Sequence, residues 1–205
     1  MYLIKTPFWL RLIYPALTWR RRNEDKTIYI TFDDGPIPDV TPFVLNSLAG
    51  YDAKATFFCI GDNVRKHPEI YKQVVEGGHA IGNHTFNHLR GWDTPVEDYV
   101  DNALKCNEYV HSTLFRPPHG RIRYSQIRAL KAAIPDVEIV MWDVLSGDFD
   151  KNLSPEKCLR NVLSATEAGS IVVFHDSLKA FDRMSYALPR ALQYWREKGF
   201  KFGVL

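Results

Sequence analysis

The chain has 205 residues, 45% of them hydrophobic, a length that suits one substantial core and is too short for two ordinary catalytic domains. Its 26 basic residues nearly balance its 24 acidic ones, for a formal charge of +2. We therefore expect no electrostatic field strong enough to attract nucleic acid or an anionic membrane. The three cysteines, at positions 59, 106 and 158, fit neither a disulfide framework nor a CxxC metal site.

Residues 1–25 precede the domain that we expect at residues 26–205. The stretch from Phe8 to Trp19 is apolar, but Arg11 interrupts it, no small-residue cleavage site follows, and about 20 apolar residues are needed to span a bilayer. We therefore predict no membrane-spanning helix, no export signal and a cytoplasmic protein. The interpretation that we favour over a membrane role is an amphipathic segment packed on the domain through one face, which carries Phe8, Trp9, Leu12, Ile13 and Ala16.

From Lys26 onward, short β-rich runs alternate with helical patterns. Such alternation with short connections requires parallel strands joined by right-handed crossovers, so the fold is either an open doubly wound α/β sheet or a closed barrel. A full eight-fold barrel takes about 250 residues, and this chain would suit an incomplete one. Seven strands are predicted, at residues 28–32, 55–60, 79–83, 114–116, 137–142, 170–175 and 200–205.

Local signals mark the helix boundaries. An N-cap residue directly precedes a proline at the first helical position in Thr41-Pro42, Thr94-Pro95 and Ser154-Pro155. We expect Pro68 and Pro189 to open two further helices. Gly77-Gly78 and Gly199 stand where a left-handed cap ends a helix just before the next strand.

Ionisable groups gather at the carboxyl ends of the predicted strands, where parallel α/β architectures place their function. Five of the seven ends carry such groups, namely Asp33-Asp34, His84 with His88, Arg116 with His119, Asp143 with Asp148, and His175-Asp176. Loops are polar in general, but a solvated surface would scatter its charges over both ends of the strands. The clustering therefore favours a functional site.

His84 and His88 are four residues apart, a spacing that on a helical turn lets both imidazoles reach one ion. Asp34, at a neighbouring strand end, would be the third ligand, and this ligand set leaves an open position on Zn²⁺, as in catalytic sites. Asp33 points to the other side of an extended chain and can serve a different role. The alternative is a polar turn at residues 33–36, but two adjacent carboxylates repel each other unless a cation is present.

Two further groups have both a functional and a structural interpretation. Arg116 can be a buried cation that holds an ionised Asp33 through a paired hydrogen bond, or an exposed arginine before a rigid Pro-Pro turn. His175 follows an apolar run and can be a capped core residue. With a carboxylate such as Asp148 beside it, His175 would instead be a tuned proton donor.

Together these residues resemble a known family, the polysaccharide deacetylases with a NodB-homology domain, which form carbohydrate esterase family 4. Five stretches carry the resemblance in the family's order, namely Thr31-Phe32-Asp33-Asp34-Gly35-Pro36, His84-Thr85-Phe86-Asn87-His88, Arg116-Pro117-Pro118-His119-Gly120, Trp142 to Phe149, and Val173-Phe174-His175. The match covers residues 26–205, which is nearly the whole chain.

The resemblance implies a fold and a set of roles. The fold would be a distorted, incomplete (β/α) barrel of about seven parallel strands. The metal would be Zn²⁺, with Co²⁺ or Ni²⁺ as alternatives, on Asp34, His84 and His88. The implied catalytic groups are Asp33 as general base with Arg116 to orient it, His175 as general acid with Asp148 to tune it, and the backbone N–H of His119 as an oxyanion donor.

The implied activity is metal-dependent removal of N-acetyl groups from an N-acetylated sugar or polysaccharide, and we expect a glycan as partner and a monomeric protein. His119 stands where the family has Tyr or Trp, and Leu145, Phe149 and Val173 replace Asp, Trp and Leu. These departures change the pocket's shape and leave the reacting groups in place. The alternatives are an amidase for a small N-acyl or cyclic imide compound, a binding protein without catalysis, and a phosphoesterase.

Overall fold

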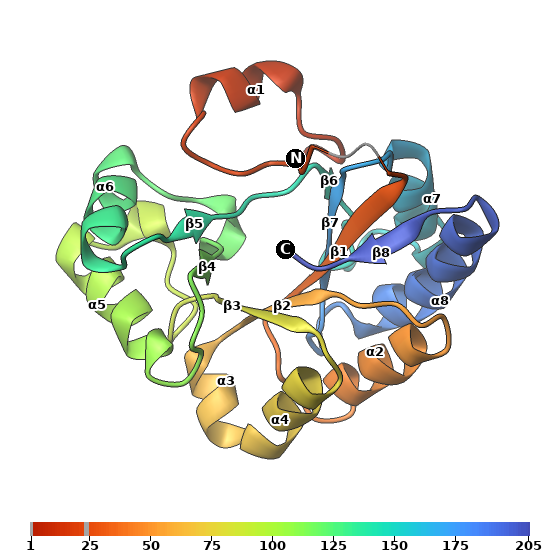
Figure 1. Cartoon of the computed structure of the whole chain (residues 1–205), viewed down its shortest axis with the longest axis horizontal. Helices are drawn as coiled ribbons and strands as arrows, with labels where there is room; N and C mark the ends of the chain where they lie inside the picture. The colour runs from red at the N-terminus through yellow and green to blue at the C-terminus, as the bar shows by residue number, and fades with distance from the viewer. Residues whose placement is uncertain (1, 23–24) are drawn as a thin grey trace.

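A computed structural model describes residues 2–22 and 25–205 of the chain. In this part of the chain the strands are β1 (Thr27–Asp33), β2 (Thr56–Cys59), β3 (Ala80–Asn83), β4 (Leu114–Phe115), β5 (Glu138–Ile139), β6 (Val144–Leu145), β7 (Ile171–His175) and β8 (Lys201–Gly203). They pair in parallel in the order β5-β4-β3-β2-β1-β7-β6, with β8 added to β1. The strands curl around a centre (Figure 1). The predicted incomplete (β/α) barrel is confirmed.

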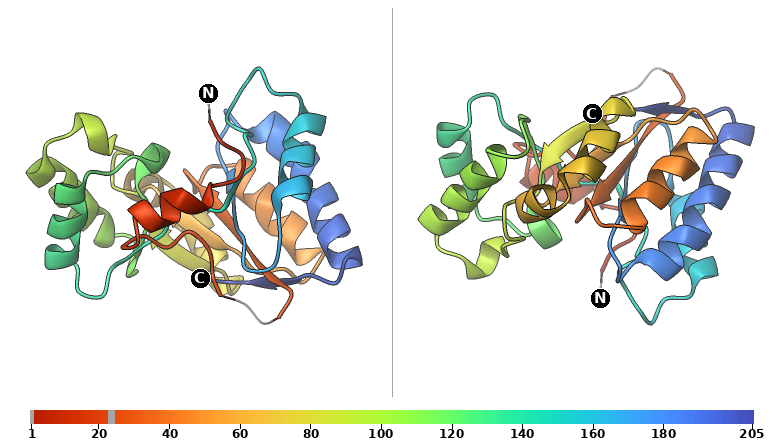
Figure 2. Two further views of the ribbon diagram at one scale, coloured as in Figure 1. Left: turned by 90° about the horizontal axis from the view of Figure 1, so that it is seen from above. Right: turned by 90° about the horizontal axis from the view of Figure 1, so that it is seen from below.

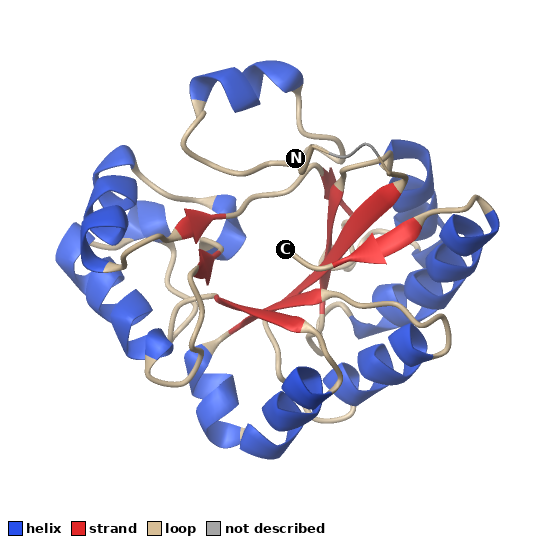
Figure 3. Ribbon diagram, in the orientation of Figure 1, coloured by secondary structure: helices blue, strands red, loops and turns tan. Residues whose placement is uncertain are grey.

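Helices cover the outside of this barrel (Figure 3). They are α1 (Phe8–Ile13), α2 (Val40–Ala49), α3 (Gly61–Lys66), α4 (Pro68–Glu76), α5 (Val96–Asn107), α6 (Tyr124–Ala133), α7 (Pro155–Ala165) and α8 (Phe181–Glu197), with 3₁₀ turns at Gly91–Asp93 and Pro118–Gly120. None of the described helices is both long enough and apolar enough to cross a bilayer.

The strand β1 divides its side chains between two environments because successive residues point to opposite faces of a sheet. Ile28, Ile30 and Phe32 are fully buried in the core that the sheet forms with the outer helices. Thr31 lies on the inner face, where its Oγ1 accepts a hydrogen bond of 2.7 Å from Arg116 Nη1. The apolar face of β1 therefore anchors the helices, while its inner face carries polar groups.

The register of the sheet brings the predicted site residues to one rim. Asp33 at the end of β1 is directly opposite His175 at the end of β7. On the other side, Asn83 of β3 pairs with Phe115 of β4, so the next residues along each strand, His84 and Arg116, emerge side by side. Parallel pairing thus gathers residues that are far apart in the sequence at the carboxyl ends of the strands.

The predicted helix starts are correct in part. Ser154 caps α7 by accepting a hydrogen bond from Lys157 N at 3.3 Å, and Pro68 opens α4. The prediction at Thr41 is wrong, since α2 begins at Val40, and the Thr94 cap is displaced by one residue, since Pro95 is the N-cap of α5.

The prediction that Pro189 opens a helix is also wrong, because this proline lies inside α8. A proline within a helix removes one backbone hydrogen bond and disfavours the helix locally. Here the helix continues because its inner face is buried on both sides of the proline, through Met184, Ala187, Leu188, Ala191, Leu192 and Trp195. Burial of this face outweighs the local preference.

Of the strand predicted at residues 137–142, only β5 (Glu138–Ile139) forms, and β6 (Val144–Leu145) lies beyond the predicted range. The residues between β5 and β6 also pair with the N-terminal segment, through hydrogen bonds from Met141 N to Thr18 O (2.7 Å) and from Thr6 N to Asp143 O (2.8 Å). The chain therefore changes partners within this stretch, first β4, then the N-terminal segment, then β7.

The N-terminal segment contacts the domain, but not through the predicted face. Helix α1 lies over the side of the barrel between α6 and α7 (Figures 1 and 2). The residues expected to be buried are all exposed, namely Phe8, Trp9, Leu12, Ile13 and Ala16. That expectation is wrong, because the flanking stretches make the contacts, with Leu17 and Trp19 buried against the core.

Candidate active site

A pocket of about 550 Å³ opens at the rim where the predicted site residues emerge. Its lining comes from most of the strand ends and includes Tyr2, Asp33, Asp34, His84, His88, His119, Trp142, Leu145, Phe149 and His175. Parallel (β/α) barrels place their catalytic groups at this end of the strands. The pocket is therefore the candidate active site.

Three of these residues form a group that could hold a metal ion. One ligand atom from each of Asp34, His84 and His88 lies within 4.8 Å of the other two. Asp34 Oδ1 is 3.2 Å from His88 Nε2 and 3.8 Å from His84 Nε2. Two imidazoles and one carboxylate are a ligand set typical of catalytic zinc sites.

The surroundings of His84 prepare its Nε2 atom to bind a cation. His84 Nδ1 lies 2.8 Å from the carbonyl oxygen of Arg116, and because a carbonyl only accepts, Nδ1 carries the hydrogen. The lone pair of Nε2 then faces Asp34. Burial lowers the pKa of His84 to about 4, so the ring is neutral at neutral pH, as a metal ligand must be.

The carboxylate of Asp34 lacks a partner that a cation would supply. Its Oδ1 atom is buried and accepts no hydrogen bond within the described residues. Burial acts to raise the pKa of Asp34, but the contact with His88 and the positive charge of His175 outweigh it and lower the pKa. An ionised, unpaired oxygen between two imidazoles fits a divalent ion.

The backbone is strained around the same residues. Seven non-glycine residues of the described chain have positive φ, and four of them lie at the rim, namely Asp34 (88°), Thr85 (63°), His88 (58°) and His119 (59°). Such conformations are unfavourable, above all for a β-branched residue such as Thr85, and they cluster at functional sites. The strain accompanies the placement of the Asp34, His88 and His119 side chains in one pocket.

Asp33 is held by the buried arginine that the sequence predicted beside it. Arg116 is fully buried, and its Nη1 donates to Asp33 Oδ1 at 2.6 Å. The guanidinium also donates to the carbonyl of Met141 at 3.0 Å and lies over the ring of Phe58 at 4.0 Å. This geometry excludes the alternative of an exposed arginine and fixes the Asp33 carboxylate on the pocket wall.

His175 is paired with Asp148 on the other side of the pocket. The two share a contact of 2.8 Å between His175 Nδ1 and Asp148 Oδ1, and His175 N donates to Asp148 Oδ2 at 2.7 Å. Burial lowers the pKa of His175, but the charge and hydrogen bond of Asp148 outweigh it and raise the pKa to about 10. His175 therefore carries a proton at neutral pH and can donate it from Nε2.

Asp176 has a structural role at the site that the sequence did not indicate. It accepts hydrogen bonds from Gly35 N at 2.9 Å and from Thr41 Oγ1 at 2.7 Å, and burial raises its pKa to about 8. A Cβ at position 35 would lie 1.9 Å from Asp176 Oδ2, so only glycine fits there. Asp176 thus ties down the loop that follows Asp33 and Asp34.

The residues that depart from the family pattern shape the wall of the pocket. The ring of His119 is 4.6 Å from that of His88, while Leu145 and Phe149 also line the pocket. Val173 is buried within β7 and is absent from the lining. The oxyanion role of the His119 backbone N–H stays a prediction.

Groups that can bind a cation, accept a proton and donate one therefore meet in one pocket of a parallel (β/α) barrel, and this is the set of groups that a metal-assisted hydrolase uses. A family model described as polysaccharide deacetylase matches residues 20–134. A peptidoglycan-N-acetylglucosamine deacetylase of Bacillus cereus is 35% identical over 192 residues, covering 91% of this chain and 89% of that protein. The chain belongs to the polysaccharide deacetylase family and is a polysaccharide N-deacetylase.

Other relatives extend this comparison. A chitooligosaccharide deacetylase of Azorhizobium caulinodans is 35% identical over 164 residues, 77% of each chain. A crystal structure of a peptidoglycan N-acetylglucosamine deacetylase superposes with a TM-score of 0.87 at 30% identity over 98% of this chain and 95% of its own. A pseudoenzyme from Bacillus anthracis, at 24% identity and a TM-score of 0.81 over 93% of this chain and 68% of its own, shares the fold.

Proposed function

We propose that the protein uses a divalent cation, Zn²⁺ in the first instance, to remove N-acetyl groups from N-acetylglucosamine units of a peptidoglycan- or chitin-like glycan. The observation that carries the proposal is the convergence of Asp34, His84 and His88 within 4.8 Å, with Asp33 and His175 in the same pocket. Relatives named for peptidoglycan and chitooligosaccharide substrates support this substrate class.

Asp34, His84 and His88 would hold the cation. The unpaired, buried oxygen of Asp34 and the neutral His84 ring support this assignment. A bound Zn²⁺ supplies Lewis-acid chemistry, since it polarises a carbonyl and lowers the pKa of water.

The protein's own groups would move the protons. Asp33, fixed by Arg116, would take a proton from the attacking water as general base. His175, kept protonated by Asp148, would protonate the departing nitrogen, without which an amide nitrogen is a very poor leaving group. The backbone N–H of His119 would stabilise the negative charge on the carbonyl oxygen.

Acetate release from N-acetylglucosamine oligomers tests this proposal. We expect wild type to release acetate, while Asp33→Asn and His175→Ala lose at least about 100-fold in kcat and still bind metal. Near-normal turnover in either variant would overturn the assigned role. No release from any glycan, with release from small N-acyl or cyclic imide compounds, would favour the amidase instead.

His111→Ala is a suitable control because His111 is exposed and lies outside the pocket. It should match wild type in both turnover and metal content. A wild type that binds glycan and lacks turnover on all of these compounds would identify a binding protein.

A further inference from the structure

The N-terminal segment supplies a residue to the active-site pocket. Tyr2 lines the pocket, although it lies 18 residues before the start of the family-model match at residue 20. Its ring centroid lies 5.0 Å from that of Phe149, and Phe149 lies 5.3 Å from the ring of His175 in an edge-on arrangement. The ring of Phe149 therefore lies against both Tyr2 and the proposed proton donor.

Several contacts fix the position and orientation of Tyr2. Its hydroxyl donates to Asp150 Oδ2 at 3.0 Å. Behind the ring, Gly147 has a φ of +82°, and a Cβ there would lie 3.0 Å from the Tyr2 hydroxyl oxygen. The loop after β6 thus leaves room for the tyrosine, and burial raises the pKa of Tyr2 to about 12, so the hydroxyl stays a donor throughout the neutral range.

The backbone that carries Tyr2 is attached to the edge of the barrel. Leu145 N donates to Ile4 O at 2.8 Å, and Lys5 forms an antiparallel bridge with Val144 of β6. Thr6 adds a side-chain hydrogen bond of 2.7 Å to Trp142 O. These bonds hold the residues after Tyr2 along the edge strand β6 and so place Tyr2 beside the pocket.

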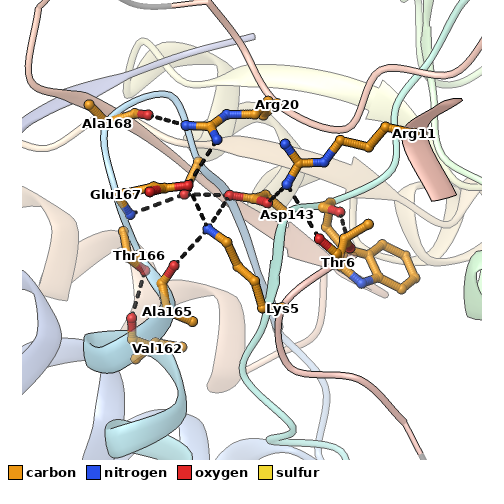
Figure 4. Close-up of polar contacts among 12 residues, drawn as sticks. Lys5, Thr6, Arg11, Arg20, Asp143, Val162, Ala165, Thr166, Glu167 and Ala168 are labelled. Carbon is orange, nitrogen blue, oxygen red and sulfur yellow. Dashed lines mark hydrogen bonds and ion pairs between the residues drawn. The ribbon is translucent and has the colours of Figure 1, made fainter. Parts of the chain in front are cut away.

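A buried ion cluster holds this attachment (Figure 4). The carboxylate of Asp143 is fully buried and accepts hydrogen bonds from Lys5 Nζ (2.7 Å), Arg11 Nη2 and Ser170 Oγ (2.6 Å). Lys5 also contacts the carbonyl of Ala165 at 2.8 Å. Two cations of the N-terminal segment thus neutralise one buried acid of the barrel, so the segment is a fixed part of the site.

We propose that Tyr2 and Phe149 form a binding subsite for a pyranose ring of the glycan. The proposal rests on the proposed function, because His175 would protonate the nitrogen that stays on the sugar. Aromatic surface beside His175 therefore faces the sugar, not the departing acetate. Aromatic rings offer rigid apolar faces to the C–H groups of a pyranose, and the polar tip of Tyr2 is already occupied by Asp150.

The subsite makes Tyr2 a specificity-determining residue for oligomeric substrates. A small ester such as 4-nitrophenyl acetate does not reach the subsite, whereas an N-acetylglucosamine pentamer does. The informative quantity is therefore the ratio of the KM for the pentamer to the KM for the ester, which cancels general damage to the site.

We expect Tyr2→Ala to raise this KM ratio about tenfold, and Tyr2→Phe, which keeps the ring, to stay within about threefold of wild type. Trp9→Ala is the matched control, because Trp9 is an aromatic residue of the same segment that lies outside the pocket. Its ratio should equal that of wild type. Melting temperatures of all variants separate local from global effects.

An unchanged KM ratio in Tyr2→Ala, or an equal change in Trp9→Ala, would overturn the proposal. Failure of the proposed function has a different signature, namely no acetate release by wild type from any glycan. In that case calorimetric titration of the pentamer into wild type and Tyr2→Ala still decides the subsite. Weaker binding by Tyr2→Ala supports it, and equal binding or none refutes it.

Discussion

The ionisation of His175 depends most on one neighbour, Asp148. Burial by itself would favour the neutral ring, and the carboxylate of Asp148 reverses that preference and raises the pKa to about 10. A group that must donate a proton is active below its pKa. The activity of the enzyme should therefore decline on the alkaline side as His175 loses its proton.

We predict that Asp148→Asn moves the alkaline limb of the kcat/KM profile to lower pH by at least about one unit. Removal of the carboxylate lowers the pKa of His175, so a smaller fraction is protonated at any pH near the limb. A bound cation offsets the charges of Asp33 and Asp34 and therefore moves the alkaline limb to lower pH in wild type and variant alike. The difference in limb position between wild type and Asp148→Asn is the test. Kinetics from pH 5 to 10 measure it, and coincident limbs would contradict the assigned role of Asp148.

Most of the residues at the site could be predicted from the sequence, because their signals are local. The spacing of His84 and His88, together with the position of Asp34 at a neighbouring strand end of the predicted parallel fold, indicates a metal site. Asp176 is indicated only as an ionisable residue at a strand end, without its partner Gly35, and Tyr2 carries no local signal. Asp176 acts on Gly35, and Tyr2 acts through Phe149, across more than 140 positions in each case, so only tertiary structure shows these contacts.

At the scale of elements, the N-terminal segment is the least conventional part of the barrel. It hydrogen bonds to the chain at Ile139 and Met141 and again at Asp143 and Leu145. Residues 139–145 run from β5 to β6, which are the two ends of the strand order. The segment thus covers the side of the barrel that the strands leave open.

We predict that the double variant Lys5→Ala with Arg11→Ala lowers the free energy of unfolding by about 2 kcal/mol or more, because it leaves Asp143 buried without a cation. Urea denaturation measures the change. Adding Asp143→Asn should recover part of the loss, since the uncompensated charge is then gone. Lys201→Ala, which breaks an exposed pair with Asp25, should change stability by less than about 0.5 kcal/mol. Equal effects of the buried and exposed variants would show that the cluster does not hold the segment.

The boundaries of elements could be predicted where a cap or proline acts locally, as at Ser154 and Pro68. They could not be predicted where burial decides, as at Pro189 within α8. The early end of the strand predicted at residues 137–142, which stops at Ile139, has the same kind of cause. The residues that follow Ile139 bond to Thr18 and Thr6, and no pattern within the predicted strand indicates that partner.

At the scale of the whole molecule, the alternation of strands and helices was sufficient to predict a parallel sheet, because short connections permit no other pairing. It was not sufficient to choose between an open sheet and a barrel. That choice depended on the resemblance to the family. The closure of the open side could not be foreseen, since it depends on hydrogen bonds between residues 4–20 and residues 139–170.

The central claim is that Asp34, His84 and His88 bind one divalent cation on which the activity of the whole molecule depends. Metal analysis of the purified protein, combined with acetate release before and after chelation, tests it most directly. We predict about one cation per chain, loss of activity with its removal, recovery with added Zn²⁺, and neither metal nor activity in His84→Ala. Undiminished acetate release by a metal-free preparation would contradict the claim.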